Sequence, residues 1–453
     1  MKNNKYEIDM CNGTIMDKLI SFAFPLMLSG ILQLMFNAVD IIVVGRFSGS
    51  QALAAVGSTT ALINVFVNLF IGISLGANVL AARFYAAGRE EEMSQTVHTA
   101  ITLALISGVV MAFVGVLFAK GALELMGTPD DVISQSTLYM RIYFMGMPFF
   151  MLYNYGAAIL RAVGDTKRPL FFLIISGCIN AGLNLILVIG FHLDVAGVAI
   201  ATIISQCVSC ILVLRCLCRT QGSYQLHFSK LSINGAYLKQ IFQVGIPAGI
   251  QSTVINFSNA LLQSSVNSFG STAMAGYTAA NNILGFLYVS INSVTQACMS
   301  FTSQNYGVGK WKRMDRVLID CLILSFVAMM ILGNSAYFFG PKLLTIYTSN
   351  SKVIQCGMEI LLYTTVTYFL CGFMDLFPGA LRGMGRSGVP MILSIIGTVG
   401  TRIVWIFWIF PNHRSLDILF ISYPASWIIT IVLQVICYYF VRKQLYAKMR
   451  AEA

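Results

Sequence analysis

The strongest constraint on this chain is a succession of apolar segments, each long enough to cross a lipid bilayer as a helix. A helix rises 1.5 Å per residue, so about twenty apolar residues cross a hydrocarbon core of about 30 Å. Only 10% of the 453 residues are charged and 57% are hydrophobic, whereas about a quarter of the residues in soluble domains are charged. The sequence therefore predicts an all-α polytopic membrane protein. The twelve expected transmembrane helices cover residues 19–44, 54–82, 95–118, 133–160, 169–190, 195–217, 240–268, 275–304, 317–340, 353–381, 390–410 and 417–441.

The basic residues predict the orientation of these spans. With the N-terminus in the cytoplasm, 22 of the 29 Lys and Arg residues fall on the cytoplasmic side and 5 on the other, and Arg141 and Arg402 lie within spans. Such a bias is typical of cytoplasmic loops, so we expect a multi-pass plasma membrane protein with both termini inside. The net charge of +11 then contacts anionic lipid headgroups and requires no nucleic acid. The polar first eighteen residues and the long apolar run after them predict no cleaved leader.

The second half of the chain repeats the first at a constant offset in residue number, and the matches lie in three separate loops. Because each half holds six spans, both copies share one topology, as in transporters built from parallel repeats. We therefore expect a monomeric secondary transporter with two pseudo-symmetric six-helix lobes, an N-lobe over 1–218 and a C-lobe over 239–453, joined by a cytoplasmic linker over 219–238. The matches pair Gly49-Ser50 with Gly270-Ser271, Tyr85 and Gly88 with Tyr306 and Gly309, and Leu160-Arg161 to Pro169 with Leu381-Arg382 to Pro390, all at an offset of 221, while Pro25 and Pro247 differ by 222.

These loops and several shorter motifs carry a family resemblance. The chain resembles the multidrug and toxic compound extrusion (MATE) family in five features. They are Pro25, Asn37-Ala38-Val39-Asp40, Gly45-Arg46-Phe47, Gln304-Asn305-Tyr306-Gly307 and the paired Leu-Arg-x-x-Gly-x-x-x-x-Pro loops. The likeness covers essentially the whole chain. It implies two six-helix lobes around a V-shaped cleft. It also implies export of drugs or metabolites by antiport with Na⁺ or H⁺.

Within the family the chain resembles the DinF-like branch. The other large bacterial branch carries a Glu in the seventh span and an Asp in the tenth, eleven residues before the arginine of the Leu-Arg loop. Here the seventh span has no acid, and Cys371 stands eleven residues before Arg382. The resemblance therefore implies an ion site in the N-terminal half.

Four polar residues of the N-terminal half are expected at one depth in the membrane. Asp40 in the first span and Asn184 in the fifth lie roughly 9 Å below the outer surface, and Thr202 in the sixth lies roughly 10 Å below it. Asn180 precedes Asn184 by four residues, so both amides share one helix face. An acid within the bilayer indicates function because its burial costs a few kcal/mol or more. We therefore predict that these four residues couple transport to an ion.

The chemistry of the predicted site leaves the coupling ion open. Carboxylate, amide and hydroxyl oxygens suit Na⁺, whereas a dry pocket would favour a proton on Asp40. The resemblance supports Asp40, Asn180 and Thr202 as ion-site residues, while well-studied members carry an Asp at the position of Asn184. We expect H⁺ or Na⁺ as the coupling ion, no cofactor and no other metal. The alternative is that the two Asn residues only join helices by hydrogen bonds.

Polar residues within the spans of the C-terminal half are candidates for substrate contact. Asp375 in the tenth span and Arg402 in the eleventh could instead form a structural ion pair. Gln263 and Asn256 lie in the seventh span. At the common offset of the repeat, Asn180 and Asn184 correspond to the non-amide residues 401 and 405, so the predicted ion site is not repeated.

Three residues of the first span are candidates for the cavity and for gating. Met35 and Asn37 could line a cavity, since a flexible Met side chain tolerates varied ligands. Pro25 removes one backbone hydrogen bond and can bend the helix that carries Asp40. We therefore expect Pro25 to act in gating.

The leading hypothesis is a cation-coupled exporter of amphipathic or cationic small molecules. The alternative is a lipid-linked oligosaccharide flippase, which would need a cleft rich in basic residues, whereas the spans contain only Arg141 and Arg402. An enzyme is not expected, because no His-Glu-x-x-His or Gly-x-Ser-x-Gly motif is present. The chain also lacks the Gly-x-x-x-x-Gly-Lys-[Ser/Thr] loop of ATP-driven transport.

Overall fold

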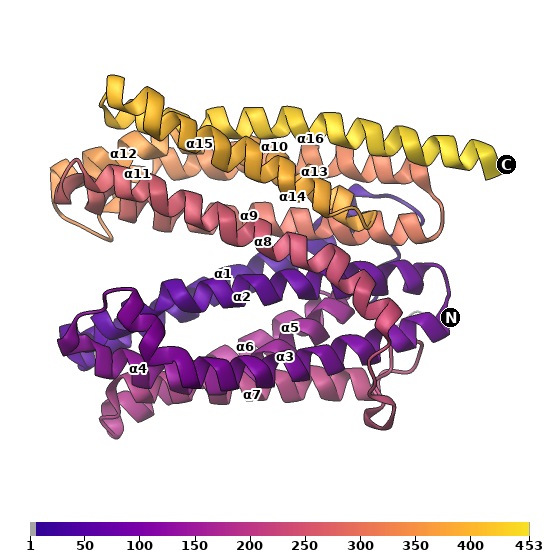
Figure 1. The fold of residues 1–453 in the computed structure, drawn as a ribbon, viewed down its shortest axis with the longest axis horizontal. Coiled ribbons are helices and arrows are strands. Elements are labelled where there is room, and N and C mark those ends of the chain that lie inside the picture. The colour runs from indigo at the N-terminus through magenta and orange to yellow at the C-terminus, as the bar shows by residue number, and fades with distance from the viewer. Residues whose placement is uncertain (1–5, 453) are drawn as a thin grey trace. The chain divides into compact units, whose positions relative to one another are not determined.

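A computed structural model describes residues 6–452, and all regular secondary structure in this range is helical (Figure 1). The first half contains α1 (Met16–Phe47), α2 (Gly49–Ala86), α3 (Glu90–Leu125), α4 (Asp130–Met145), α5 (Met147–Ala162), α6 (Lys167–Asn184), η1 (Leu185–Gly190) and α7 (Asp194–Arg219). The second half contains η2 (Phe228–Lys230), α8 (Gly235–Asn267), α9 (Ser271–Gly307), α10 (Trp311–Phe338), α11 (Gly340–Leu344), α12 (Ser351–Thr365), α13 (Tyr368–Gly383), α14 (Gly388–Ser394), η3 (Ile395–Gly400), α15 (Thr401–Val404), η4 (Trp405–Ile409), η5 (Phe410–Asn412) and α16 (Leu416–Glu452).

The expected fold class, an all-α polytopic membrane protein, is confirmed. Within the described range, nine helices are long and apolar enough to cross a membrane, and α12 with α13, bent by 48°, makes a tenth span. The other two expected spans are helical as α8 and as α4 with α5, although hydropathy alone does not select them. The span formed by α4 and α5 is interrupted at Gly146. Pro148 follows shortly after, and its missing N–H cannot continue the hydrogen bonds of a helix.

Backbone conformation confirms the repeat independently of residue identity. In three loops, glycines at equivalent positions of the two halves share a left-handed conformation, which residues with a side chain rarely adopt. The same turn therefore follows the corresponding helix in each half. The pairs are Gly49 (φ +88°) with Gly270 (φ +97°), Gly88 (+67°) with Gly309 (+69°), and Gly164 (+93°) with Gly385 (+80°).

The offset between corresponding helix starts stays within one residue of 221 through the eleventh span. Helices α6 and α14 begin at Lys167 and Gly388, an offset of 221, whereas α7 and α16 begin at Asp194 and Leu416, an offset of 222. Between these points the second half has the additional π-helix η3, and a π turn takes more residues than an α turn. Arg402 follows η3 and lies one residue from the position that the offset of 221 assigns to Asn180.

Packing divides the chain into two compact units whose bounds differ from the expected lobes at 1–218 and 239–453. The first unit comprises Met1–Asp9 and Phe24–Ile246, and the second comprises Met10–Ala23 and Pro247–Ala453. Helices α1 and α8 therefore each pass from one unit to the other part-way along their length. These changes occur next to Pro25 and at Pro247, where the missing N–H weakens the helix.

The start of each crossing helix packs closely within the unit it begins in. In the first unit, a Cβ on Gly76 of α2 would lie 2.1 Å from the carbonyl oxygen of Ile241 in α8, so the two backbones are nearly in contact. In the second unit, the ring of Phe22 in α1 meets that of Phe301 in α9 edge to face, with centroids 5.8 Å apart. These contacts explain why packing separates the chain inside two continuous helices.

The segment expected to be a linker, 219–238, packs against the first unit. Tyr224 is 2% exposed, and its hydroxyl donates a hydrogen bond of 2.6 Å to Glu7. Burial and this bond raise the pKa of the Tyr224 phenol above its ordinary value, so the hydroxyl remains a donor. The backbone N–H of His227 donates to the imidazole of His98 at 3.1 Å. The segment is therefore part of a folded unit.

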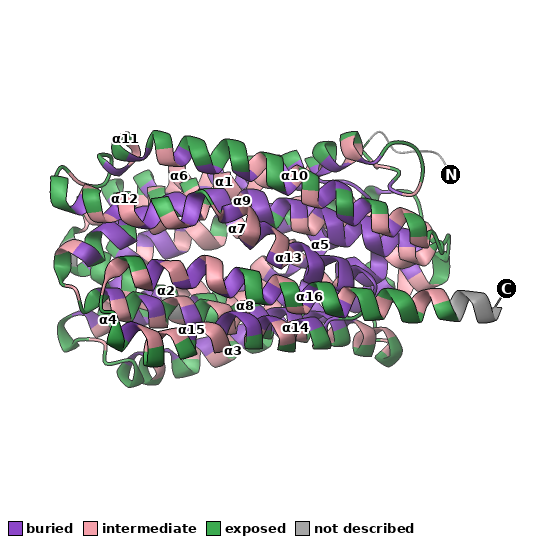
Figure 2. Ribbon diagram, turned by 90° about the horizontal axis from the view of Figure 1, so that it is seen from above, coloured by how far each residue is buried: buried purple, intermediate pink, exposed green. Residues whose placement is uncertain are grey.

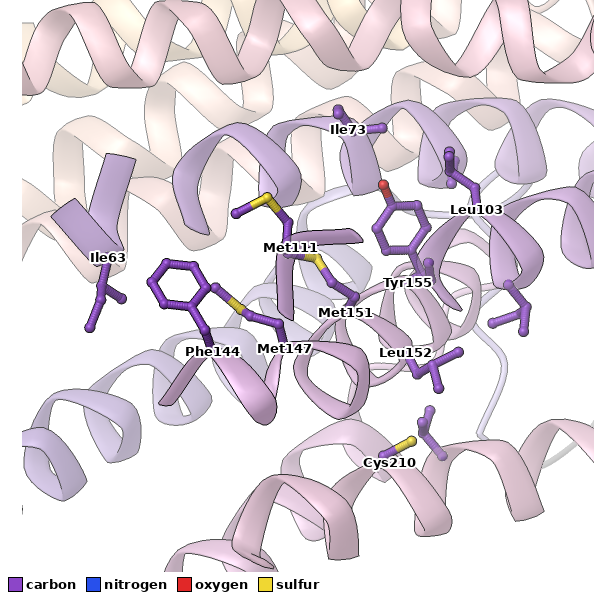
Figure 3. Packing of buried hydrophobic residues seen from close by; sticks show 14 of the residues in the cluster. Ile63, Ile73, Leu103, Met111, Phe144, Met147, Met151, Leu152, Tyr155 and Cys210 are labelled. Carbon is purple, nitrogen blue, oxygen red and sulfur yellow. The ribbon is translucent and has the colours of Figure 1, made fainter. Parts of the chain in front are cut away.

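Within the first unit, helix α3 packs on α4 and α5 through glycines. A Cβ on Gly115 would lie 2.1 Å from the ring of Phe144. Figure 3 shows Met147 and Met111 beside that ring in the buried cluster. Buried and exposed residues alternate along the same helices (Figure 2), so each helix has one packed face and one open face.

Candidate functional site

The four residues predicted to form the ion site lie in one hydrogen-bonded chain within the first unit. The Asn184 amide donates to the Asp40 carboxylate and, at 3.2 Å, to the amide oxygen of Asn180. The Asn180 amide donates to the Thr202 hydroxyl at 3.5 Å, and Thr202 donates to the carbonyl of Val198 at 3.0 Å. The structure therefore brings together α1, α6 and α7 as the sequence predicted.

Local sequence explains how these side chains are placed. Asn180 and Asn184 are one helical turn apart, and α6 changes to the π-helix η1 directly after Asn184. One turn before Asp40, the ring of Phe36 lies against Gly177, where a Cβ would be only 1.8 Å from the ring. Only a glycine allows α1 to approach α6 this closely, and that approach lets Asp40 reach Asn184.

The cluster offers oxygen atoms and no positively charged side chain. Among the described residues, no Lys, Arg or His forms a salt bridge with Asp40. Asn184 is fully buried, and its side-chain oxygen has no hydrogen-bond partner in the described chain. A carboxylate beside an unpartnered amide oxygen can accept a proton or contribute ligands to Na⁺.

Two tyrosines and a glutamine near the site were not predicted. Tyr139 and Tyr143 of α4 lie close enough to Asp40 for electrostatic interaction, and Tyr143 also hydrogen-bonds Gln206. Gln206 lies one turn after Thr202, so i, i+4 spacing could have indicated it. Neither tyrosine carried a comparable signal, because an aromatic residue in an apolar span more often packs against other helices.

The remaining candidates of the first span differ in exposure. Met35 is 51% exposed and Asn37 is exposed as well, and their spacing of two residues places them on different sides of α1. Pro25 is buried and stands where α1 passes into the first unit. Their roles in a cavity and in gating stay predictions.

In the second unit, the ion pair considered as one alternative for Asp375 and Arg402 is not formed among the described residues. Asp375 accepts a hydrogen bond of 3.2 Å from the hydroxyl of Tyr288. Arg402 instead donates to the side-chain oxygen of Asn259 at 2.6 Å and lies over the ring of Tyr423, 4.7 Å from its centroid. The depth of each residue within its membrane span, which is all that the sequence gives, could not show that the two side chains bond to different neighbours.

The other two candidates of this unit, Asn256 and Gln263, are exposed on α8. They are seven residues apart, which places them on one face of the helix. Among the described residues no cluster of three or more His, Cys, Asp or Glu side chains is arranged to hold a metal ion.

A helical membrane protein built from two six-span repeats, with a buried polar cluster in one of them, belongs to the class of membrane transporters with internal repeats. The sequence pattern of the MatE family matches residues 25–186 and 247–408, once in each half. The chain therefore belongs to the MatE family of transporters and is not an enzyme. The resemblance to the MATE family seen in its motifs is thus confirmed.

Similar proteins agree with this assignment. The probable multidrug resistance protein YoeA of Bacillus subtilis (strain 168) is 31% identical over 434 residues, 93% of each chain. The probable multidrug resistance protein YpnP of the same strain is 25% identical over 396 residues, 86% of this chain and 87% of that one. The structure of an outward-facing multidrug resistance MATE family transporter of the MOP superfamily matches the fold with a TM-score of 0.90 at 21% identity, over 99% of this chain and 100% of that one.

Proposed function

We propose that this transporter exports amphipathic or cationic small molecules, including drugs, by antiport with H⁺ or Na⁺ through alternating access. The observation that carries the proposal is the hydrogen-bonded chain from Asp40 through Asn184 and Asn180 to Thr202. It joins a carboxylate to neutral oxygen groups at membrane depth, as exchange of a monovalent cation requires. The names of the relatives YoeA and YpnP support drugs as the exported class.

The N-terminal location of the site supports its assignment to ion coupling. At the place of Asp40 the second half has Leu261 or Leu262, so that half lacks the corresponding acid. An antiporter of this kind would bind its coupling cation in one unit only. This pattern also supports the DinF-like branch that the sequence predicted.

Gating by Pro25 is part of the proposal. Helix α1 carries Asp40 at one end and passes between units at Pro25. A proline-weakened helix can bend when occupation of the Asp40 site changes its packing. The variant Pro25→Ala should lower transport without lowering expression, and unchanged transport would contradict this role.

The membrane placement follows the charge distribution. A plasma membrane location with cytoplasmic termini agrees with the excess of Lys and Arg on one side of the spans. The flippase alternative would need a cleft rich in basic residues, and the spans offer only two arginines, one in each unit. Arg141 is exposed and donates to the carbonyl of Val116, and Arg402 lies in the other unit.

The test is ethidium efflux from membrane vesicles under Na⁺ and H⁺ gradients imposed separately. Wild-type efflux should depend on one gradient, and Asp40→Asn should abolish that dependence because the amide cannot release a proton or neutralise Na⁺. A matched control is Asp17→Asn, which changes an exposed acid in the first turn of the same helix. Full gradient-driven efflux by Asp40→Asn would overturn the proposal.

A further inference from the structure

The second unit holds a buried positive charge where the first unit holds an amide of the proposed ion site. Arg402 is 3% exposed and lies one residue from the position that the repeat offset of 221 assigns to Asn180. The helices that supply its partners, α8 and α16, are the counterparts of α1 and α7 in the first half. The corresponding part of the repeated fold therefore holds a carboxylate on α1 in the first half and a guanidinium in the second.

Within the described chain, the hydrogen-bond partners of the Arg402 guanidinium are all neutral. Its Nη1 donates to Asn259 at 2.6 Å and to Ser258 at 3.4 Å, and its Nε donates to Ser426 at 3.3 Å. Among the described residues, no Asp or Glu lies within salt-bridge distance of it. A buried charge without a counter-charge is costly, so this site favours the arrival of an anion.

The surroundings of the guanidinium supply further donors. No described residue accepts a hydrogen bond from its Nη2. The amide of Asn259 uses its oxygen to bind Arg402, which leaves its N–H groups as donors. The hydroxyls of Tyr277 and Tyr423 are 2.8 Å apart, so one of them can donate to the other while the second proton remains available. Hydrogen-bond donors around a fixed positive charge are the groups that bind a carboxylate.

An exposed polar face leads to this cluster. Ser252, Asn256 and Gln263 are exposed on α8, and Asn259 lies on the same face at spacings of three and four residues. Polar groups within a membrane span face the protein interior or a water-filled cavity, not lipid. A solute that follows this face reaches Arg402 through Asn259.

We propose that Arg402, Asn259 and the Tyr277–Tyr423 pair form a binding site for a single negatively charged group, the carboxylate of a transported amphiphile. One guanidinium with neutral donors matches one negative charge, in contrast to the several charges of a pyrophosphate. The proposal extends the proposed function, because it adds zwitterionic and anionic amphiphiles to the substrates. Chloride has the same charge and is the inorganic source to be distinguished.

The experiment compares a carboxylate with its ester in the detergent-purified full-length protein. The probes are rhodamine B, which has a free carboxylate, and its ethyl ester, and fluorescence anisotropy gives the Kd of each. Arg402→Gln should weaken binding of the acid about tenfold or more, because bonds to charged groups contribute about 1.5–3 kcal/mol. Binding of the ester should change less than about twofold. Retained ester binding also shows that the variant is folded.

Two further variants make the test specific. Arg402→Lys keeps the charge without the planar donor fork, so the acid should lose less affinity than in Arg402→Gln. The control Arg141→Gln removes an exposed arginine of the other unit and should change neither Kd. Equal losses for acid and ester, or unchanged acid binding in Arg402→Gln, would overturn the proposal.

The source of the anion is resolved by repeating the titrations in chloride and in gluconate. Weaker acid binding in chloride for the wild type, but not for Arg402→Gln, would support the site and show that it also accepts an inorganic anion. Equal Kd values in both salts would assign it to the substrate carboxylate alone. Because these measurements use no ion gradient, their failure is distinct from failure of the ion-coupled efflux experiment.

Discussion

The contact between Gly177 and Phe36 should determine how tightly the transporter binds its coupling ion. In Gly177→Ala the new Cβ would lie 1.8 Å from Cζ of Phe36 and 1.9 Å from its Cε2. Carbon atoms in contact are about 3.5–4.0 Å apart, so the ring must move by about 2 Å. Such overpacking typically costs about 1–3 kcal/mol of stability. The displaced helix α1 carries Asp40 one turn further on, so its hydrogen bond with Asn184 should be lost.

The expected effect on transport follows from that hydrogen bond. If Na⁺ is the coupling ion, moving Asp40 away from the Asn184 amide removes a ligand oxygen, and about ten- to hundredfold more Na⁺ should be needed for half-maximal efflux, as for a contact of about 1.5–3 kcal/mol. If H⁺ is the coupling ion, the change should be opposite in sign, because the hydrogen bond from the amide favours the charged carboxylate and its loss favours the proton. The assay is gradient-driven ethidium efflux at a series of concentrations of the coupling cation. Thermal unfolding of the purified variant measures the loss of stability separately.

The matched control and the rescue make this reasoning refutable. Gly182→Ala lies on the same helix with open space around its Cβ, and it should leave both measurements at wild-type values or slightly raise stability. Phe36→Leu removes the ring atoms that Ala would meet, so Gly177→Ala with Phe36→Leu should recover much of the cation affinity. Wild-type cation dependence in Gly177→Ala, or no recovery in the double variant, would refute the positioning role.

Three further predictions concern other parts of the first unit. Asn184→Asp adds a second carboxylate to the site, so Na⁺ should raise the unfolding temperature of this variant more than that of the wild type; an equal shift would contradict Na⁺ binding there. Gly76→Ala places a methyl group 2.1 Å from a backbone oxygen of α8 and should lower stability by about 1–3 kcal/mol in thermal unfolding, whereas Gly57→Ala, in open space on the same helix, should not. Tyr224→Phe removes one of the two tyrosine donors to the partly buried carboxylate of Glu7, so limited proteolysis within 219–238 should become faster at a cost of about 1–3 kcal/mol, and an unchanged rate would show that this bond does not hold the segment.

Much of the fold follows from local sequence patterns. Hydropathy predicts the helices because backbone groups in lipid must bond within their own segment. Identical residues at equivalent positions of the two halves predict the repeat, since glycines such as Gly164 and Gly385 form the same left-handed turn. The depth of Asp40 in its span follows from the rise of a helix, and i, i+4 spacing aligns Asn180 with Asn184.

Contacts between distant segments could not be predicted in this way. Depth placed Asp375 and Arg402 within their spans, but the direction of each side chain depends on helix rotation and on which neighbours pack there. Tyr288 and Asn259 are the bonded partners. The second half also contains the additional π-helix η3 just before Arg402, and sequence spacing alone gives no sign of where such a turn forms.

The sequence by itself determined that this is a twice-repeated helical membrane protein with one acid at ion-site depth in its first half, because these properties depend on periodicity, length and charge along the chain. Only the tertiary structure decided that α1 and α8 change units at their prolines, that Gly177 admits Phe36 so that Asp40 meets Asn184, and that Arg402 bonds to neutral side chains. The physical reason is that these features depend on which helix faces meet, and packing of the whole chain selects those faces.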